Sequence, residues 1–111
     1  MKVFANTDVG LVRQLNEDDY CIAHNANDEW MAIVCDGIGG AKAGEVASHT
    51  AVMTMYEAFM KSPVFEKDRQ VDNWIRENLN QANDFIYSKS LKNPNERGMG
   101  TTAVGVIKAH I

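Results

Sequence analysis

Two helical segments follow one another in this sequence without a strand between them, and that succession limits the folds open to the chain. The apolar residues of the first segment recur at four-residue spacing, at Ala47, Ala51, Met55 and Phe59. This spacing predicts a helix that begins near Gly44 and ends near Pro63. The second segment has apolar residues at spacings of three and four, at Val71, Trp74, Ile75, Leu79, Ala82 and Ile86. It predicts a second helix that stops before Asn93.

Apolar stretches on either side of this helix pair predict four strands. Three strands precede the helices, at residues 3–5, 20–23 and 30–35, and one follows them, at residues 101–107. The polar residues 24–29 supply the loop of a hairpin. Because residues 30–35 are apolar throughout, we expect this strand to be buried on both faces.

The resulting order, β-β-β-α-α-β, excludes an alternating βαβ sheet and predicts an α+β fold. Both helices should stack together on one face of the sheet. The other face is then uncovered, or is covered by something absent from this chain. The last strand has no following strand to pair with, so we expect an unpaired apolar edge through which the chain self-associates.

Composition narrows the class of protein further. Apolar residues make up 45% of the 111 residues, which is enough for the core of one ordinary globular domain. No run approaches the ~18 apolar residues of a membrane span, and the N-terminus turns polar too early for a signal peptide. We therefore expect a cytoplasmic protein without membrane contact. A net charge of −4 and a pI near 5.2 argue against nucleic-acid binding, which requires a basic face.

Cysteine-based and glycine-based sites are excluded by their spacing. Cys21 and Cys35 lie in apolar stretches and form no Cys-x-x-Cys pair, so we interpret them as buried, reduced thiols rather than zinc ligands. A phosphate-binding P-loop needs Lys and then Ser or Thr after its second glycine, where this chain has Glu45 and Val46.

The sharpest local feature lies at the end of the third predicted strand. Asp36 follows the apolar run directly and is succeeded by Gly37-Ile38-Gly39-Gly40. Glycines allow the backbone to approach a ligand and to turn its carbonyl groups toward a cation. A carboxylate beside a backbone carbonyl suits Mg²⁺ or Mn²⁺ rather than zinc. The alternative is a strand that simply ends in an Asp-Gly turn, which is common.

A charged segment precedes the second predicted strand. Arg13 is followed by the acidic residues Glu17, Asp18 and Asp19, a pattern that by default indicates a solvated loop. If these carboxylates converge on Asp36, two of them about 4 Å apart repel by about 4 kcal/mol at an effective dielectric constant near 20, and a cation is needed to relieve the repulsion. The guanidinium of Arg13 is then matched to a phosphate group.

Three segments resemble consecutive motifs of one protein family. They are GLVRQLNED (residues 10–18), VCDGIGGAKAGEVAS (residues 34–48) and GMGTT (residues 98–102). They look like the motifs of the metal-dependent PPM or PP2C-type Ser/Thr protein phosphatases, and the bacterial branch fits best. The resemblance implies two stacked antiparallel sheets with paired helices outside, an α-β-β-α sandwich that is incomplete in this chain.

The same resemblance implies a role for each matching residue. Asp36 bridges two Mg²⁺ or Mn²⁺ ions through its carboxylate, and Gly37 offers its backbone carbonyl to one of them. Glu17 and Asp18 act on the ions through water, and Arg13 holds the substrate phosphate. The implied substrates are proteins carrying phosphoserine or phosphothreonine, placed there by a Ser/Thr kinase.

Two departures from the family pattern bear on activity. Ile38 stands where some relatives carry a His that is a candidate general acid. The family domain is also much longer, with further Asp ligands in its later part. We therefore expect residues 1–111 to be the N-terminal portion of one such domain, a truncated fragment that is weakly active or inactive.

Two other functions stay open at this point. The chain is alternatively a non-catalytic phosphoprotein-binding module of the same fold, which the missing ligands favour. It is otherwise an unrelated acidic α+β interaction domain in which Asp36 and Gly37 form only a turn. A structure that separates Arg13, Glu17 and Asp18 from Asp36 favours this last interpretation.

Overall fold

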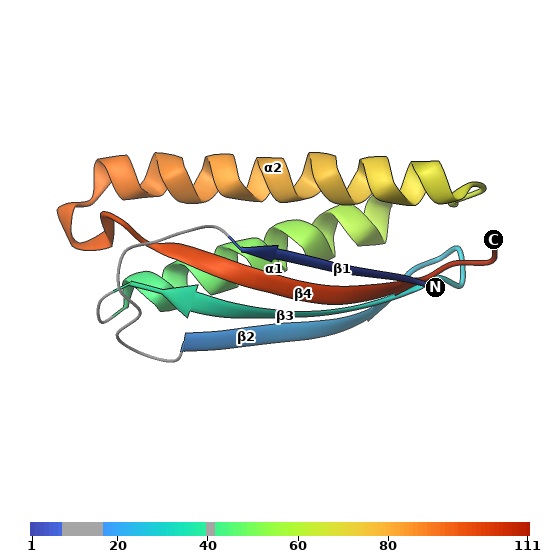
Figure 1. The fold of residues 1–111 in the computed structure, drawn as a ribbon, viewed down its shortest axis with the longest axis horizontal. Helices are drawn as coiled ribbons and strands as arrows, with labels where there is room; N and C mark the ends of the chain where they lie inside the picture. The colour runs from blue at the N-terminus through green and yellow to red at the C-terminus, as the bar shows by residue number, and fades with distance from the viewer. Residues whose placement is uncertain (8–16, 40–41) are drawn as a thin grey trace.

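The computed structural model describes residues 1–7, 17–39 and 42–111 (Figure 1). The elements in chain order are β1 (Lys2–Thr7), β2 (Glu17–His24), β3 (Trp30–Ile38), α1 (Ala43–Lys61), α2 (Asp68–Lys92), the short 3-10 helix η1 (Pro94–Glu96) and β4 (Gly100–Lys108). The predicted order of strands and helices is confirmed. The acidic residues 17–19 lie within β2 rather than in a loop before it, so that part of the sequence prediction is wrong.

The four strands form one antiparallel sheet in the order β1-β4-β3-β2. β4 therefore lies inside the sheet and is paired on both sides, with β1 and with β3. The expectation of an unpaired edge at the last strand is wrong, because β1 returns to pair with β4 from Lys2 opposite Ile107 to Thr7 opposite Thr102. The predicted route of self-association through that edge loses its structural basis.

The two helices stack on one face of the sheet, as predicted. α1 packs across β2, β3 and β4, and α2 packs along α1 (Figure 1). α1 stops where Ser62 adopts an extended conformation ahead of Pro63. At the start of α2, the side-chain oxygen of Gln70 accepts hydrogen bonds from the backbone N–H groups of Glu66 (2.7 Å) and Lys67 (3.0 Å). Neither helix in the described ranges has the length and apolar run that crossing a bilayer requires.

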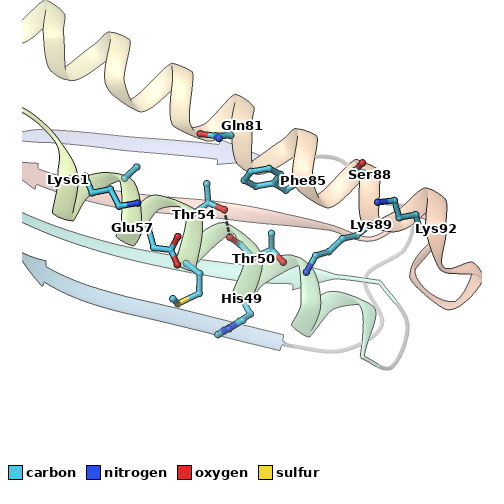
Figure 2. A pocket seen from close by; sticks show the side chains of 12 residues that line it. His49, Thr50, Thr54, Glu57, Lys61, Gln81, Phe85, Ser88, Lys89 and Lys92 are labelled. Carbon is cyan, nitrogen blue, oxygen red and sulfur yellow. Dashed lines mark hydrogen bonds between the residues drawn. The ribbon is translucent and has the colours of Figure 1, made fainter.

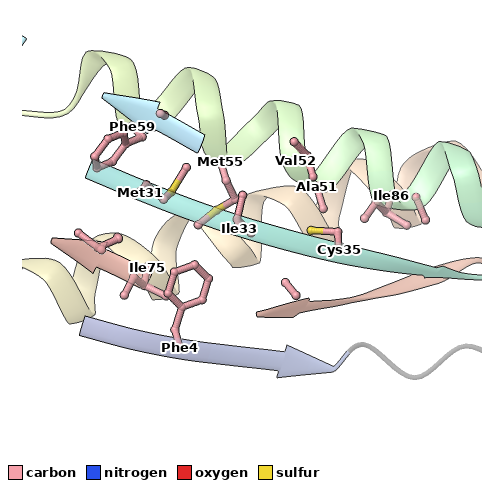
Figure 3. Close-up of a cluster of buried hydrophobic side chains, with 14 of the residues drawn as sticks. Phe4, Met31, Ile33, Cys35, Ala51, Val52, Met55, Phe59, Ile75 and Ile86 are labelled. Carbon is pink, nitrogen blue, oxygen red and sulfur yellow. The ribbon is translucent and has the colours of Figure 1, made fainter. Parts of the chain in front are cut away.

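The hydrophobic core fills the space between the sheet and the helices. β3 contributes Met31, Ile33 and Cys35, and α1 contributes Met55 and Phe59, all fully or almost fully buried (Figure 3). Trp74 of α2 closes one end by packing edge-on against Phe59 and Phe65, with ring centroids 5.9 and 5.8 Å apart. The periodic apolar residues of both helices thus supply the core that the sequence predicts.

The other face of the sheet is open in the described part of the chain. Burial alternates along β3, and Trp30 and Val34 are 43% and 52% exposed. The expectation that this strand is buried on both faces is wrong, because both helices lie on the same side and the apolar run does not reveal which face is covered. Further exposed apolar side chains in the neighbouring strands are Tyr20, Ile22 and Val104.

A buried polar network joins the β2–β3 turn to the α1–α2 connection. Glu29 is fully buried and accepts hydrogen bonds from the Asn25 amide (3.1 Å) and from the backbone N–H of Phe65 (2.9 Å). The Asn25 side-chain oxygen accepts the N–H groups of Asn27 and Glu29, each at 3.0 Å. The polar stretch 24–29 is therefore a hairpin turn, as predicted, with one carboxylate directed into the protein.

We expect Glu29→Ala to lower the free energy of unfolding by about 2 kcal/mol, because two buried donors lose their acceptor. Urea denaturation followed by circular dichroism measures the change. Glu66→Ala removes an exposed carboxylate from the same connection and should cost less than about 0.5 kcal/mol. Equal effects of the two substitutions contradict a structural role for the buried carboxylate.

Candidate functional site

Strand pairing brings two of the sequence motifs together at one end of the sheet. Asp36 of β3 lies directly opposite Asp18 of β2, and Gly37 lies opposite Glu17. Residues directly opposite in an antiparallel pair have α-carbons about 5 Å apart. The backbone positions of the predicted metal-site residues 17, 18, 36 and 37 are therefore adjacent. Arg13 lies outside the described residues, as do the side chains of Glu17 and Asp18.

Asp36 belongs to the set of β3 residues that alternates away from the helices. Cys35 before it is fully buried on the helix side, whereas Asp36 is half-buried at the end of the open face. On its other flank Asp36 lies opposite Thr102 of β4. The Thr101 hydroxyl donates a hydrogen bond of 3.2 Å to the Asp36 backbone carbonyl. The strand end that carries the carboxylate is thus held on both sides.

Two glycines allow β3 to approach α1 closely. They are Gly37, which follows Asp36, and Gly44, in the first turn of α1. A Cβ atom added to Gly37 would lie 1.9 Å from the backbone oxygen of Gly44, in the first turn of α1. Gly39 has φ +145°, in the region that disfavours side chains. The first turn of α1 is therefore placed beside the strand end, where the helix dipole favours negative charge.

The third acidic residue of the charged segment points elsewhere. Asp19 faces the helix side, where its Oδ2 lies 2.8 Å from Nδ1 of His49 on α1. Its Oδ1 accepts the backbone N–H of Tyr20 at 2.9 Å. No local sequence pattern indicates this contact, because Asp19 and His49 lie 30 positions apart in the chain. Asp19 is thus separated from Asp36 by the alternation of the sheet.

The nearby thiols are poorly suited to nucleophilic chemistry. Burial, with a smaller contribution from Asp19, raises the pKa of Cys35 from its ordinary value of 9.0 to about 12. Burial also raises the pKa of the half-buried Cys21. Both cysteines are free, and Cys35 is buried as the sequence predicts, whereas the prediction that Cys21 is buried is wrong because it is half-buried. A thiolate, rather than a thiol, is the nucleophile in cysteine chemistry, so neither residue is a candidate at neutral pH.

We expect alkylation by iodoacetamide at pH 8 to modify Cys21 well before Cys35, as measured by mass spectrometry of the folded protein. The folded state also keeps the Cys35 proton between pH 9 and 12, where an unfolded chain loses it. The contribution of the Cys35 thiol to the free energy of unfolding is therefore fully present below pH 9 and is lost as the pH rises toward 12. Faster modification of Cys35 than of Cys21 contradicts this assignment.

The ligand atoms at the strand end are oxygens, the type of atom that hard divalent cations bind. A half-buried carboxylate and a backbone carbonyl are oxygen ligands of the sort that Mg²⁺ and Mn²⁺ prefer. Among the side chains that the structure describes, no group of three or more His, Cys, Asp or Glu residues is arranged to hold a metal ion. The described residues therefore offer part of such a site.

Comparisons with known proteins agree with this arrangement. A sequence model described as protein phosphatase 2C matches residues 10–110. The serine/threonine phosphatase stp of Listeria monocytogenes is 33% identical over 103 residues, which cover 93% of this chain and 41% of the relative. The structure of Stp1 from Staphylococcus aureus matches with a TM-score of 0.76 and 34% identity, over 96% of this chain and 42% of that one.

A third match concerns the metal. The catalytic domain of the serine/threonine protein phosphatase PstP, solved in complex with two manganese ions, aligns with a TM-score of 0.66 and 28% identity. The alignment covers 98% of this chain and 44% of that one. The chain thus spans less than half the length of the relatives that it matches.

Proposed function

This chain belongs to the protein phosphatase 2C family, and from that membership we propose that it supplies the N-terminal part of a metal-dependent protein serine/threonine phosphatase domain. The observation that carries the proposal is the register of β2 on β3. It places Asp18 opposite Asp36 and Glu17 opposite Gly37, so that residues of two separate motifs meet at one sheet end. The α+β fold, with both helices on one face, matches the solved phosphatase structures.

The site residues divide into two roles in this proposal. Asp36 would hold Mg²⁺ or Mn²⁺ ions through its carboxylate, and Gly37 through its backbone carbonyl. Glu17 and Asp18 would act on the ions through water, and Arg13 would bind the phosphate of the substrate. When bound, the ions lower the pKa of water and offset the charge of the phosphate. The match to a relative solved with two manganese ions supports this choice of metal.

The protein's own residues orient and support this chemistry. The first turn of α1 approaches β3 at Gly37, which sets the position of the neighbouring Asp36. The Thr101 hydroxyl fixes the Asp36 backbone from the other side. Ile38 carries no titratable proton, so the proton for the leaving hydroxyl comes from another group. We also propose proteins that carry phosphoserine or phosphothreonine as substrates, which the name of a relative, serine/threonine phosphatase, supports. An opposing Ser/Thr kinase is part of the same proposal.

Two further properties belong to the proposal. The described chain offers few ligands, so we expect the 111 residues alone to bind metal weakly and to be weakly active or inactive. We also propose a cytoplasmic location, which the two free cysteines support because reduced thiols persist in a reducing compartment.

The test is a phosphate-release assay on the protein expressed from its own gene, with a phosphothreonine peptide as substrate. We expect hydrolysis that requires Mn²⁺ or Mg²⁺ and that stops when EDTA is added. The Arg13→Ala variant should raise KM more than it lowers kcat, since its role is to bind the phosphate. Tight binding of the peptide without hydrolysis at any metal concentration supports the non-catalytic module instead. If the protein neither binds nor hydrolyses the peptide, the acidic interaction domain is the interpretation that remains.

A further inference from the structure

We propose that the groove between α1 and α2 is a docking site for an acidic peptide segment of a partner protein. The groove encloses about 800 Å³ on the helix layer and is lined by both helices (Figure 2). The open sheet face, where Asp36 lies, is on the other side of the sheet. A segment held in the groove therefore leaves the proposed catalytic centre free.

The first argument for this occupant is charge. The chain carries a net charge of −4, yet the groove is lined by Lys61, Lys89 and Lys92 against the single carboxylate of Glu57. All three lysines are exposed, and Figure 2 shows Lys61 and Lys89 near opposite ends of the groove. A locally basic groove on an acidic protein attracts an acidic segment and repels copies of the chain itself.

The second argument is the apolar surface between the lysines. Met53 and Phe85 are 38% and 46% exposed where the two helices face each other across the groove. Exposed apolar side chains rimmed by charged and hydroxyl groups are typical of interaction sites. Phe85 is central among the labelled side chains of Figure 2 and can pack against one apolar residue of the bound segment.

The groove also sets the length of the segment. The α1 residues that line it run from His49 to Lys61, a rise of about 18 Å along a helix. An extended peptide of five to six residues spans about the same distance. The proposed ligand is therefore a short segment with acidic residues toward both ends and an apolar residue between them.

A fluorescein-labelled hexapeptide with Glu residues toward both ends and Leu and Ala between them serves as the probe in an anisotropy titration of the protein expressed from its own gene. We expect saturable binding that weakens as salt is added, and binding at least about tenfold weaker for the same peptide with Gln in place of Glu. The variant Lys89→Glu/Lys92→Glu should weaken binding at least about tenfold, and Phe85→Ala at least about threefold.

The matched control is Arg76→Glu/Lys108→Glu, which makes the same change of net charge at exposed positions outside the groove. Glu near the C-terminal end of α2 opposes the helix dipole and can destabilise the helix. A second variant, Lys89→Gln/Lys92→Gln, therefore removes the positive charges without adding negative ones, and we expect it to lose peptide affinity to an intermediate extent. The proposal is overturned if the groove variants and the control variant weaken peptide binding equally. It is also overturned if the acidic peptide binds no more tightly than its Gln counterpart. Preferential binding of an RNA oligonucleotide also overturns it. Phosphatase activity on a peptide without acidic residues should be the same in all these variants.

Discussion

In the protein expressed from its own gene, Asp36→Asn is expected to lower the proposed metal-dependent phosphatase activity by at least about 100-fold while the protein stays folded. The amide has the shape of the carboxylate but lacks its charge, and the affinity of a site for a divalent cation depends on the number of charged ligands. The Asp36 residue is half-buried, and the hydrogen bond from Thr101 reaches its backbone, so the substitution keeps this contact at the strand end. Activity with saturating Mn²⁺ and the Mn²⁺ dependence of the rate measure the effect.

Asp19→Asn is the control for this prediction. It makes the same chemical change on the neighbouring strand, at a carboxylate that faces His49 on the helix side of the sheet. We expect it to keep activity within a few-fold of the unchanged protein, because the contact with His49 lies at the surface and on the opposite face of the sheet from Asp36. A similar loss from both substitutions contradicts the special role of Asp36, and an active Asp36→Asn protein removes the proposed metal site.

Gly37→Ala is expected to lower the free energy of unfolding by at least about 3 kcal/mol. The added methyl group would lie 1.9 Å from the Gly44 backbone oxygen, and neither backbone can yield by rotating a side chain. Either β3 or the start of α1 must move, which also displaces Asp36. Chemical denaturation measures the loss of stability, and the phosphate-release assay measures the accompanying loss of activity.

Gly44→Ala provides a graded comparison for the same contact. Its Cβ would lie 3.1 Å from the nearest Gly37 atom, a tighter distance than usual but one that a small shift relieves. Alanine is also the better helix former at this position in α1. We expect a cost below about 1 kcal/mol. If Gly37→Ala is as stable as the unchanged protein, β3 and α1 do not approach this closely.

The helices could be predicted from the sequence because each is held by one periodic apolar face. The residues from Val71 to Ile86 that repeat along α2 include its principal core contacts, and α1 begins and ends close to the predicted residues. Periodicity reports which side of a helix is buried. It does not report which partner covers it, and for that reason the sheet was harder to predict than the helices.

The errors in the sheet share one cause. Local patterns do not show that β1 returns to flank β4, and an all-apolar strand such as β3 does not show which of its faces is covered. The burial of Glu29 could not be predicted for the same reason. It lies in a polar turn segment, yet it is fully buried and accepts a hydrogen bond from the distant Phe65. The register of Asp18 on Asp36 likewise depends on the hairpin as a whole.

The interior position of β4 determines when the sheet can be completed during synthesis. β2 and β3 are joined by a short turn and can pair as soon as both have left the ribosome. β1 is made first, but its partner is the last strand of the described sheet. The N-terminal strand must therefore stay unpaired until almost all of these residues have been made. A nascent chain of this kind is exposed to aggregation and to chaperone binding for most of its translation.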